Sequence, residues 1–228
     1  MASRPDSQLS KKEVAAVIHN QGISKMSGMT RPLLALSFAL IGFASSVSAQ
    51  ETVRIRGTIE SVEGPVYVVK NRDGAQIKLT LADNPKVVAT VPAAMADIKP
   101  GLFIGSAGTM QPDGTQKASE VHIFPESMRG AGEGHYDWDL QPQNKMTNAN
   151  IEQSVTGVDG QMLSVKYKGG EKKLLVTPDT KVVKFVSGDG NDLKPGTHIF
   201  VPGGKKQPDG TVQTPVIIYG KDGLTPPM

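Results

Sequence analysis

The 228-residue sequence contains no cysteine, which excludes disulfide bonds, thiolate metal sites and cysteine nucleophiles. Aromatic residues are also scarce, with six Phe, four Tyr and one Trp, whereas 25 Gly and 16 Pro indicate many turns. Few aromatic residues and frequent turns are typical of small β modules rather than of a large helical domain. The stability of the protein must therefore come from small β cores alone.

The body of the chain lacks any excess of charge of one sign. The formal net charge of +3 and the pI of about 9.0 arise at the N-terminus, because five of the 25 basic residues but only two of the 22 acidic residues precede Gln50. From Gln50 onward there are 20 residues of each sign. Proteins that bind phosphate backbones usually carry a basic patch. We therefore expect no nucleic-acid partner.

Long apolar runs are also missing. Residues 33–43 form an uncharged apolar run of 11 residues, which is too short to span a bilayer, since a span takes about 20. The run follows the basic start Met29-Thr-Arg31 and precedes Val47-Ser-Ala49, whose small residues suit a signal peptidase. This pattern predicts a signal peptide over 29–49, cleaved between Ala49 and Gln50, and a periplasmic or secreted protein. An uncleaved membrane anchor is the alternative.

Residues 1–28 precede this segment and do not fit an export signal. We interpret them as an over-called or disordered N-terminal extension, and Met1, Met26 and Met29 are the candidate translation starts. The mature protein then begins at Gln50. No cysteine follows the small residues, which excludes lipoprotein processing.

After Gln50, apolar and polar residues alternate over short stretches, which predicts β-strands. Asp73-Gly74 and Asp113-Gly114 supply the positive φ angles of tight turns. Turn signals recur often enough to favour a small sandwich or barrel. The expected strands of the first half are 53–62, 66–69, 76–81, 86–91, 102–104 and 118–124, with one helical turn at 93–98.

Five sequence blocks recur in the same order at an offset of 95 or 96 residues, which predicts an internal duplication. A stretch between the two copies, residues 128–150, contains the only tryptophan, Trp138. The paired blocks are Gly57–Gly64 with Ser154–Gly160, Lys78–Val88 with Lys173–Val183, Ile98–Gly101 with Leu193–Gly196, Gln111–Thr115 with Gln207–Thr211, and Val121–Ile123 with Val216–Ile218.

The fold prediction is an all-β protein with two tandem, small OB-like β-barrels of five to six strands, joined by an ordered linker that contains Gly, Trp and Asp. Closing each sheet into a barrel removes the exposed edges of so short a sheet. A single sandwich that shares strands between the copies is the alternative. The expected boundaries are 50–127 for the first barrel, 128–150 for the junction, 151–220 for the second barrel and 221–228 for a frayed tail.

One resemblance rests on three motifs: Gly57-Thr-Ile-Glu-Ser-Val62, Leu193-Lys-Pro-Gly196 before a strand, and an Asp-Gly turn before Ala118-Ser-Glu-Val-His-Ile123. They resemble exported bacterial OB-like domains of unknown function, although Thr214-Pro215 replaces Ala118-Ser119 in the second copy. Arg129–Leu140 resembles a junction in alphaproteobacterial relatives, some of which carry automatic labels as metal-transporter permeases. A permease is excluded here, because no segment beyond the signal peptide is long enough to cross a membrane. The resemblance covers nearly all of 50–220 and implies a fold rather than a function.

Four potential metal ligands, Glu133, His135, Asp137 and Asp139, lie within seven residues. In an extended segment they alternate onto one side, and imidazole with carboxylates suits Zn²⁺, Mn²⁺ or Ni²⁺. No second histidine lies at a ligand-like spacing, however. The competing interpretation is a polar, ordered linker in which Trp138 packs onto one barrel.

Other polar groups carry weaker signals. His122 and His198 lie in strand patterns and are interpreted as surface or strand-end histidines. The lysines of 166–173 form a basic hairpin, and we interpret them as side chains on solvent-exposed strand faces. Gly130, Gly132 and Gly134 suit positive φ angles better than an anion cradle. We find no nucleophile elbow and no H-E-x-x-H motif, so no catalytic residue and no cofactor is predicted.

The sequence thus predicts an exported, non-enzymatic binding or envelope-interaction protein, whose partner is an unknown protein or envelope ligand and whose oligomeric state is open. The first alternative is a periplasmic protein, associated with metal transport, that binds a divalent metal through His135, Asp137, Asp139 and Glu133. The second alternative is an enzyme with an unrecognised site between the barrels.

Overall fold

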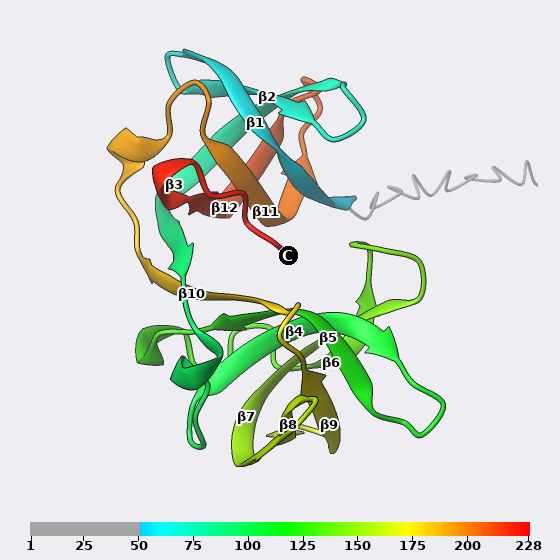
Figure 1. The fold of residues 1–228 in the computed structure, drawn as a ribbon. Coiled ribbons are helices and arrows are strands. Elements are labelled where there is room, and N and C mark those ends of the chain that lie inside the picture. Colours follow the sequence, from blue (N-terminus) through cyan, green and yellow to red (C-terminus); the bar gives the residue numbers. More distant parts are fainter. Residues whose placement is uncertain (1–50) are drawn as a thin grey trace, which may run out of the picture. The chain divides into compact units, whose positions relative to one another are not determined.

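The computed structural model describes residues 51–228, which contain twelve β-strands, four 3-10 helices of one turn and no α-helix (Figure 1). The all-β prediction is therefore confirmed. These residues all lie within one unit, Val47–Met228. In the part of the chain that is described, no helix has the length and apolarity that a membrane span requires. The expected extension (1–28) and signal peptide (29–49) lie outside the described residues.

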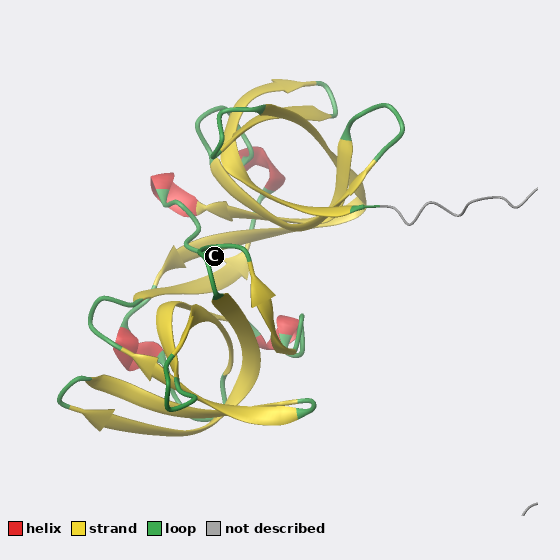
Figure 2. Ribbon diagram, turned by 90° about the vertical axis from the view of Figure 1, so that its right-hand side faces the viewer, coloured by secondary structure: helices red, strands yellow, loops and turns green. Residues whose placement is uncertain are grey.

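Five strands close into a barrel (Figure 2). Strands β1 (Thr52–Glu63), β2 (Val66–Asn71) and β3 (Gln76–Pro92) form an antiparallel meander. Strand β11 (His198–Lys206) then pairs with β1, and β12 (Val212–Gly220) pairs with β11 and, in parallel, with β3. The alternating apolar residues point inward, and the core contains Ile55, Ile59, Val69, Leu79, Val201 and Ile217.

A second circuit of paired strands involves β4 (Phe103–Met110), β5 (Gln116–Ile123), β7 (Asn144–Gly157), β8 (Gly160–Tyr167) and β9 (Gly170–Val176). Strand β4 pairs with β5 and β7, β8 pairs with β7 and β9, and two residue pairs join β5 to β9. The short strand β6 (Gly134–Trp138) pairs with β7. The core of this second circuit contains Ile104, Val121, Ile151, Leu163 and Leu174.

Neither ring consists of one continuous segment. Strands β1–β3 close with β11 and β12, whereas β7–β9 close with β4 and β5. The expected barrel boundaries, 50–127 and 151–220, therefore do not match the rings, each of which uses strands from both segments. The physical reason lies in β3: the two strands expected at 76–81 and 86–91 form one 17-residue strand that carries the chain out of the first ring.

The chain crosses between the rings twice, along β3 and along β10 (Lys181–Ser187). These strands pair antiparallel with Thr90 opposite Phe185, and the pairing is symmetrical about that point, since Val88 faces Ser187 and Pro92 faces Val183. Strand β10 also pairs in parallel with β5. The crossing therefore binds the two rings to each other through main-chain hydrogen bonds.

The strand pairing revises which residues of the two segments correspond. Ile59 and Ile151 each precede a register shift, and each accepts a 2.8 Å hydrogen bond, from the N–H of Gly196 and of Gly101 respectively. They lie 92 residues apart, not 96 as the first sequence block implies. In the last block, Val121 and Ile217 are the corresponding core residues, at an offset of 96 rather than 95. The duplication itself stays a prediction.

Two expectations about connecting segments were wrong. The tail 221–228 is not frayed: it contains the 3-10 turn η4 (Lys221–Gly223), Met228 is 1% exposed, and its carbonyl oxygen accepts a 2.8 Å hydrogen bond from Arg56 Nε. Residues 144–150 of the expected junction belong to β7. The other 3-10 turns are η1 (Met95–Asp97), where a helical turn was expected, η2 (Glu126–Met128) and η3 (Gly190–Asp192).

The strand exchange predicts that residues 50–127 cannot form a closed monomeric barrel alone, because β1 and β3 then lack their partners β11 and β12. We expect this fragment to associate or to stay unfolded, and an equimolar mixture with residues 128–228 to restore a 1:1 complex. Size-exclusion chromatography with light scattering and thermal melts followed by circular dichroism measure this. A monomeric 50–127 fragment with a cooperative melt would contradict the exchange.

Candidate functional site

A cavity of about 450 Å³ opens beside the crossing of β3 and β10. Its volume lies within the range of roughly 300–1,000 Å³ that is usual for small-molecule sites. Polar side chains from four different segments also reach it: Arg54, Lys86, His122 and Asn148. The rest of the wall is mainly apolar, and its aromatic members are Phe124, Tyr136, Trp138, Phe185 and Phe200.

A β-bulge in β5 turns His122 toward this cavity. Gly108 pairs with Ala118 and Ala107 with Glu120, so Ser119 is an extra residue in the ladder. Because the extra residue of a bulge reverses the face to which the following side chains point, Ala118 and Val121 both point into the ring core. Glu120 and His122 point to the opposite face. Strand β12 has a corresponding register shift at Pro215, and Val216 and Ile218 then line the same cavity.

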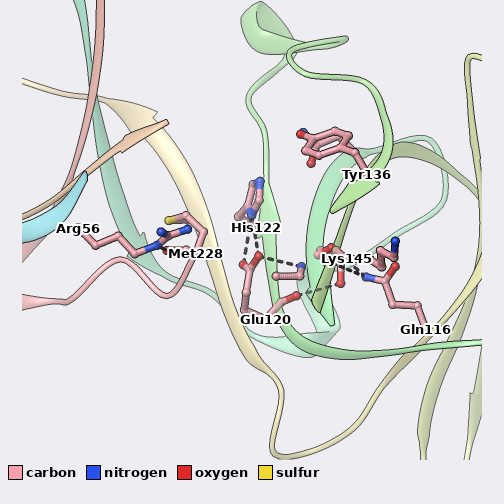
Figure 3. Close-up of polar contacts among 10 residues, drawn as sticks. Arg56, Gln116, Glu120, His122, Tyr136, Lys145 and Met228 are labelled. Atoms are coloured by element: carbon pink, nitrogen blue, oxygen red, sulfur yellow. Dashed lines mark hydrogen bonds and ion pairs between the residues drawn. The ribbon is translucent and has the colours of Figure 1, made fainter. Parts of the chain in front are cut away.

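Glu120 and His122 form a buried pair, with 1% and 4% of their surfaces exposed. His122 Nδ1 lies 3.2 and 3.1 Å from the two carboxylate oxygens of Glu120, and the N–H of Ala107 donates to Oε1 at 3.0 Å (Figure 3). Since a carboxylate only accepts, Nδ1 carries the proton. In the neutral ring, Nε2 is then an acceptor. The hydrogen bonds to Glu120 therefore fix the tautomer of a neutral His122 and leave Nε2 as the acceptor.

His122 Nε2 has no hydrogen-bond partner among the described residues, and it lies over Gly105 beside Asn148. An ideal Cβ on Gly105 would be 2.0 Å from His122 Nε2 and 2.4 Å from Asn148 Oδ1. Asn148 Nδ2 donates to the Gly132 carbonyl at 3.0 Å and to Tyr136 Oη at 3.1 Å, which orients the amide. Two hydrogen-bond acceptors, His122 Nε2 and Asn148 Oδ1, thus both lie against Gly105.

Two further buried atoms of the wall lack partners within residues 51–228: Asn148 Oδ1 and Trp138 Nε1. The great majority of buried polar atoms in proteins have at least one hydrogen-bond partner. An unmet donor or acceptor costs about 1–3 kcal/mol of stability. Asn148 Oδ1 and Trp138 Nε1 are therefore buried polar atoms of lining residues whose hydrogen-bonding capacity is unmet within residues 51–228.

Aromatic contacts hold the walls in place. The His122 ring stacks on Phe185 and meets the edge of Phe124, with ring centroids 4.8 Å apart in both cases. Elsewhere in the wall, Trp138 packs edge-on against Phe200 at 6.0 Å, and the Arg54 guanidinium lies 4.2 Å above the indole. Figure 3 shows His122 between Tyr136 and Met228. The cavity is therefore lined by rings of fixed orientation.

Arg56 joins the cavity wall to the junction. Its Nη2 donates to Asp139 Oδ1 at 2.6 Å, its Nε donates to the Met228 carbonyl, and its guanidinium lies 4.9 Å above Phe200. Burial by itself raises the pKa of Asp139, but the hydrogen bond and charge of Arg56, with Arg54, outweigh it and hold that pKa below its usual value. Asp139 is therefore an ionised partner of Arg56.

The structure does not bring the four predicted metal ligands together. Within the described residues, no group of three or more His, Asp or Glu side chains has an arrangement that suits a metal ion. Each of the four instead has its own partner: Glu133 accepts from the Lys168 N–H, His135 Nδ1 bonds Thr147 Oγ1, Asp137 pairs with Lys145, and Asp139 pairs with Arg56. Metal binding stays a prediction.

His122 is not a surface histidine, since its ring is buried, although it does lie one residue before the end of β5. His198 is half-buried, with Nδ1 2.9 Å from Thr58 Oγ1. Glu120 was not singled out, because Glu-x-His in an alternating strand is also the pattern of a solvent-facing edge. The positive-φ interpretation of Gly130, Gly132 and Gly134 is confirmed, and their φ angles are 84°, 59° and 145°.

Comparison with protein-family models, curated proteins and solved structures gives no match for this chain. The resemblance to exported OB-like domains therefore remains an expectation. Inference about function rests on the cavity, its unpartnered polar atoms and the strand pairing that creates it.

Gly105→Ala tests the packing at the base of the cavity. The added methyl group would overlap His122 Nε2 and Asn148 Oδ1, so we expect the free energy of unfolding to fall by about 2 kcal/mol. Gly157→Ala is the matched control, because the nearest atom to its ideal Cβ lies 3.8 Å away, and its effect should stay within about 0.5 kcal/mol. Urea unfolding measures both, and equal losses would contradict the tight contact.

His135 predicts a component of acid sensitivity. Burial, followed by the charges of Lys172 and Lys145, lowers the pKa of His135 below 6.5. The unfolded chain therefore binds this proton more readily, and stability that is present above pH 6.5 is lost as the pH falls through the lower folded-state pKa. Between about pH 8 and about pH 5, the wild type should lose more stability than His135→Gln. Parallel urea-unfolding profiles for the two proteins would contradict this.

Proposed function

We propose that the protein is a non-enzymatic binding protein, active after export, that holds a small and largely apolar organic ligand in the cavity. One observation carries the proposal: three side chains in the wall of a largely apolar cavity, His122, Trp138 and Asn148, each have a polar atom without a hydrogen-bond partner within residues 51–228. Such a combination matches the usual small-molecule site, in which an apolar wall gives affinity and a few polar groups fix orientation.

We also infer that the chain is a duplicated pair of OB-like barrels that exchange their last two strands. The matching register shifts in β1 and β7, and in β5 and β12, support this inference. In this view residues 128–150 act as more than a linker, because Tyr136 and Trp138 complete the cavity wall. The fold by itself assigns no ligand.

An enzyme is the second candidate, because the Glu120–His122 pair resembles a general base with its orienting carboxylate. Binding is favoured over catalysis, because a general base needs a hydroxyl to activate. Among the described lining residues the hydroxyl is that of Tyr136, and its Oη already donates to the Gly132 carbonyl and accepts from Asn148. Burial raises the pKa of Tyr136, which keeps the phenol protonated. Mass spectrometry of a ligand recovered after incubation separates the two, because a binding protein returns it unchanged.

Titration with N-phenyl-1-naphthylamine, an apolar fluorescent probe, tests the proposed binding. Trp138 is the only tryptophan and lines the cavity, so probe emission should rise with 1:1 saturation while Trp138 emission falls. Val216→Phe fills the cavity and should weaken binding by at least about tenfold. Val155→Phe is the control, because Val155 is 64% exposed and outside the wall, and it should bind as the wild type does. Equal binding by both variants would contradict the site.

A further inference from the structure

The geometry points to a hydroxylated aromatic compound, of the phenol or naphthol class, as the ligand of this cavity. This inference rests on the proposed binding function and adds the chemistry of the polar group. The ligand hydroxyl donates a hydrogen bond to His122 Nε2 beside Asn148 Oδ1.

The polar end of the ligand must donate a hydrogen bond. Glu120 holds a proton of His122 on Nδ1, so Nε2 of the neutral ring accepts. The neighbouring Asn148 Oδ1 also accepts, and the three hydrogen bonds of Nδ2 to Ala131, Gly132 and Tyr136 prevent the amide from turning over. A ligand carboxylate or ketone at this place would face two acceptors and gain no hydrogen bond from either.

A neutral hydroxyl fits the charges better than an ammonium group does. Arg54 and Lys86 line the same cavity, and the guanidinium groups of Arg54 and Arg56 already lie above the Trp138 and Phe200 rings. A cationic ligand would be repelled by these side chains.

The walls orient such a ligand. On β5 the bulge presents His122, whereas at the corresponding places on β12 the chain presents Val216 and Ile218. One wall is therefore polar at its base and the other is aliphatic. Flat rings pack well in a cavity whose wall includes Phe124, Phe185, Trp138 and Phe200.

The test compares 2-naphthol with 2-methoxynaphthalene, which has the same rings and oxygen but no donor. Isothermal titration calorimetry on the wild type should give about tenfold tighter binding of 2-naphthol, because the ether leaves buried acceptors unmet. The double variant Glu120→Val with His122→Ile places on β5 the residue types that β12 carries at Val216 and Ile218. Replacing a buried polar pair by apolar residues usually preserves the fold, and a thermal melt checks this.

In the double variant, we expect both compounds to bind and the preference for 2-naphthol to disappear. Retention of the preference would overturn the assignment of His122. Equal affinities in the wild type would overturn the hydroxyl inference and leave the binding function in place. Binding of neither compound, nor of N-phenyl-1-naphthylamine, would overturn the binding function itself.

If the double variant does not fold, ¹⁵N-histidine NMR of the wild type provides the second measurement. A hydrogen bond from the ligand changes the chemical shift of an unprotonated imidazole nitrogen. We expect one Nε2 resonance to move on addition of 2-naphthol and to stay in place with 2-methoxynaphthalene. Identical responses to the two compounds would overturn the inference.

Discussion

The parallel pairing of β12 with β3 is the interaction on which the rest of the structure depends. It closes the first ring with strands from the far end of the chain, and it is possible because β3 stays extended from Gln76 to Pro92. The continuation of β3 then pairs with β10, and β10 pairs with β5. This arrangement leaves the outer faces of β5 and β12 to line one cavity, which two self-contained barrels in sequence would not produce.

Register shifts give β5 and β12 two different faces. In β5, Ala118 and Val121 fill a ring core, whereas Glu120 and His122 belong to the cavity side. A buried carboxylate is unfavourable unless it is hydrogen-bonded, and the Ala107 N–H together with His122 Nδ1 meets that need. The hydrogen bond between His122 Nδ1 and Glu120 therefore both stabilises the buried carboxylate and fixes the tautomer of His122.

Local patterns in the sequence predict the strands, the Asp-Gly turns and the helical turn near Met95, because each depends on neighbouring residues alone. The exchange depends on a choice between two similar strand pairs, β4–β5 and β11–β12, and local alternation does not encode it. His122 was misread for a related reason: alternation with Val121 does place it outside the ring core, but Phe124, together with Phe185 of β10, covers that face. Trp138 was expected to pack onto one barrel but lies in a cluster with residues of both rings, and its charged neighbours bond to different strands.

The unequal residues at corresponding places on β5 and β12 have a consequence for how such a site can evolve. A homodimer of identical half-length chains, built on the same two-fold crossing, would place the same side chains on both walls of a cavity at the symmetry axis. A single chain has no such restriction, because each wall carries its own residues. The two strands therefore differ: β5 carries the polar pair Glu120 and His122, whereas β12 carries Val216 and Ile218. A ligand can then bind with its polar end toward β5.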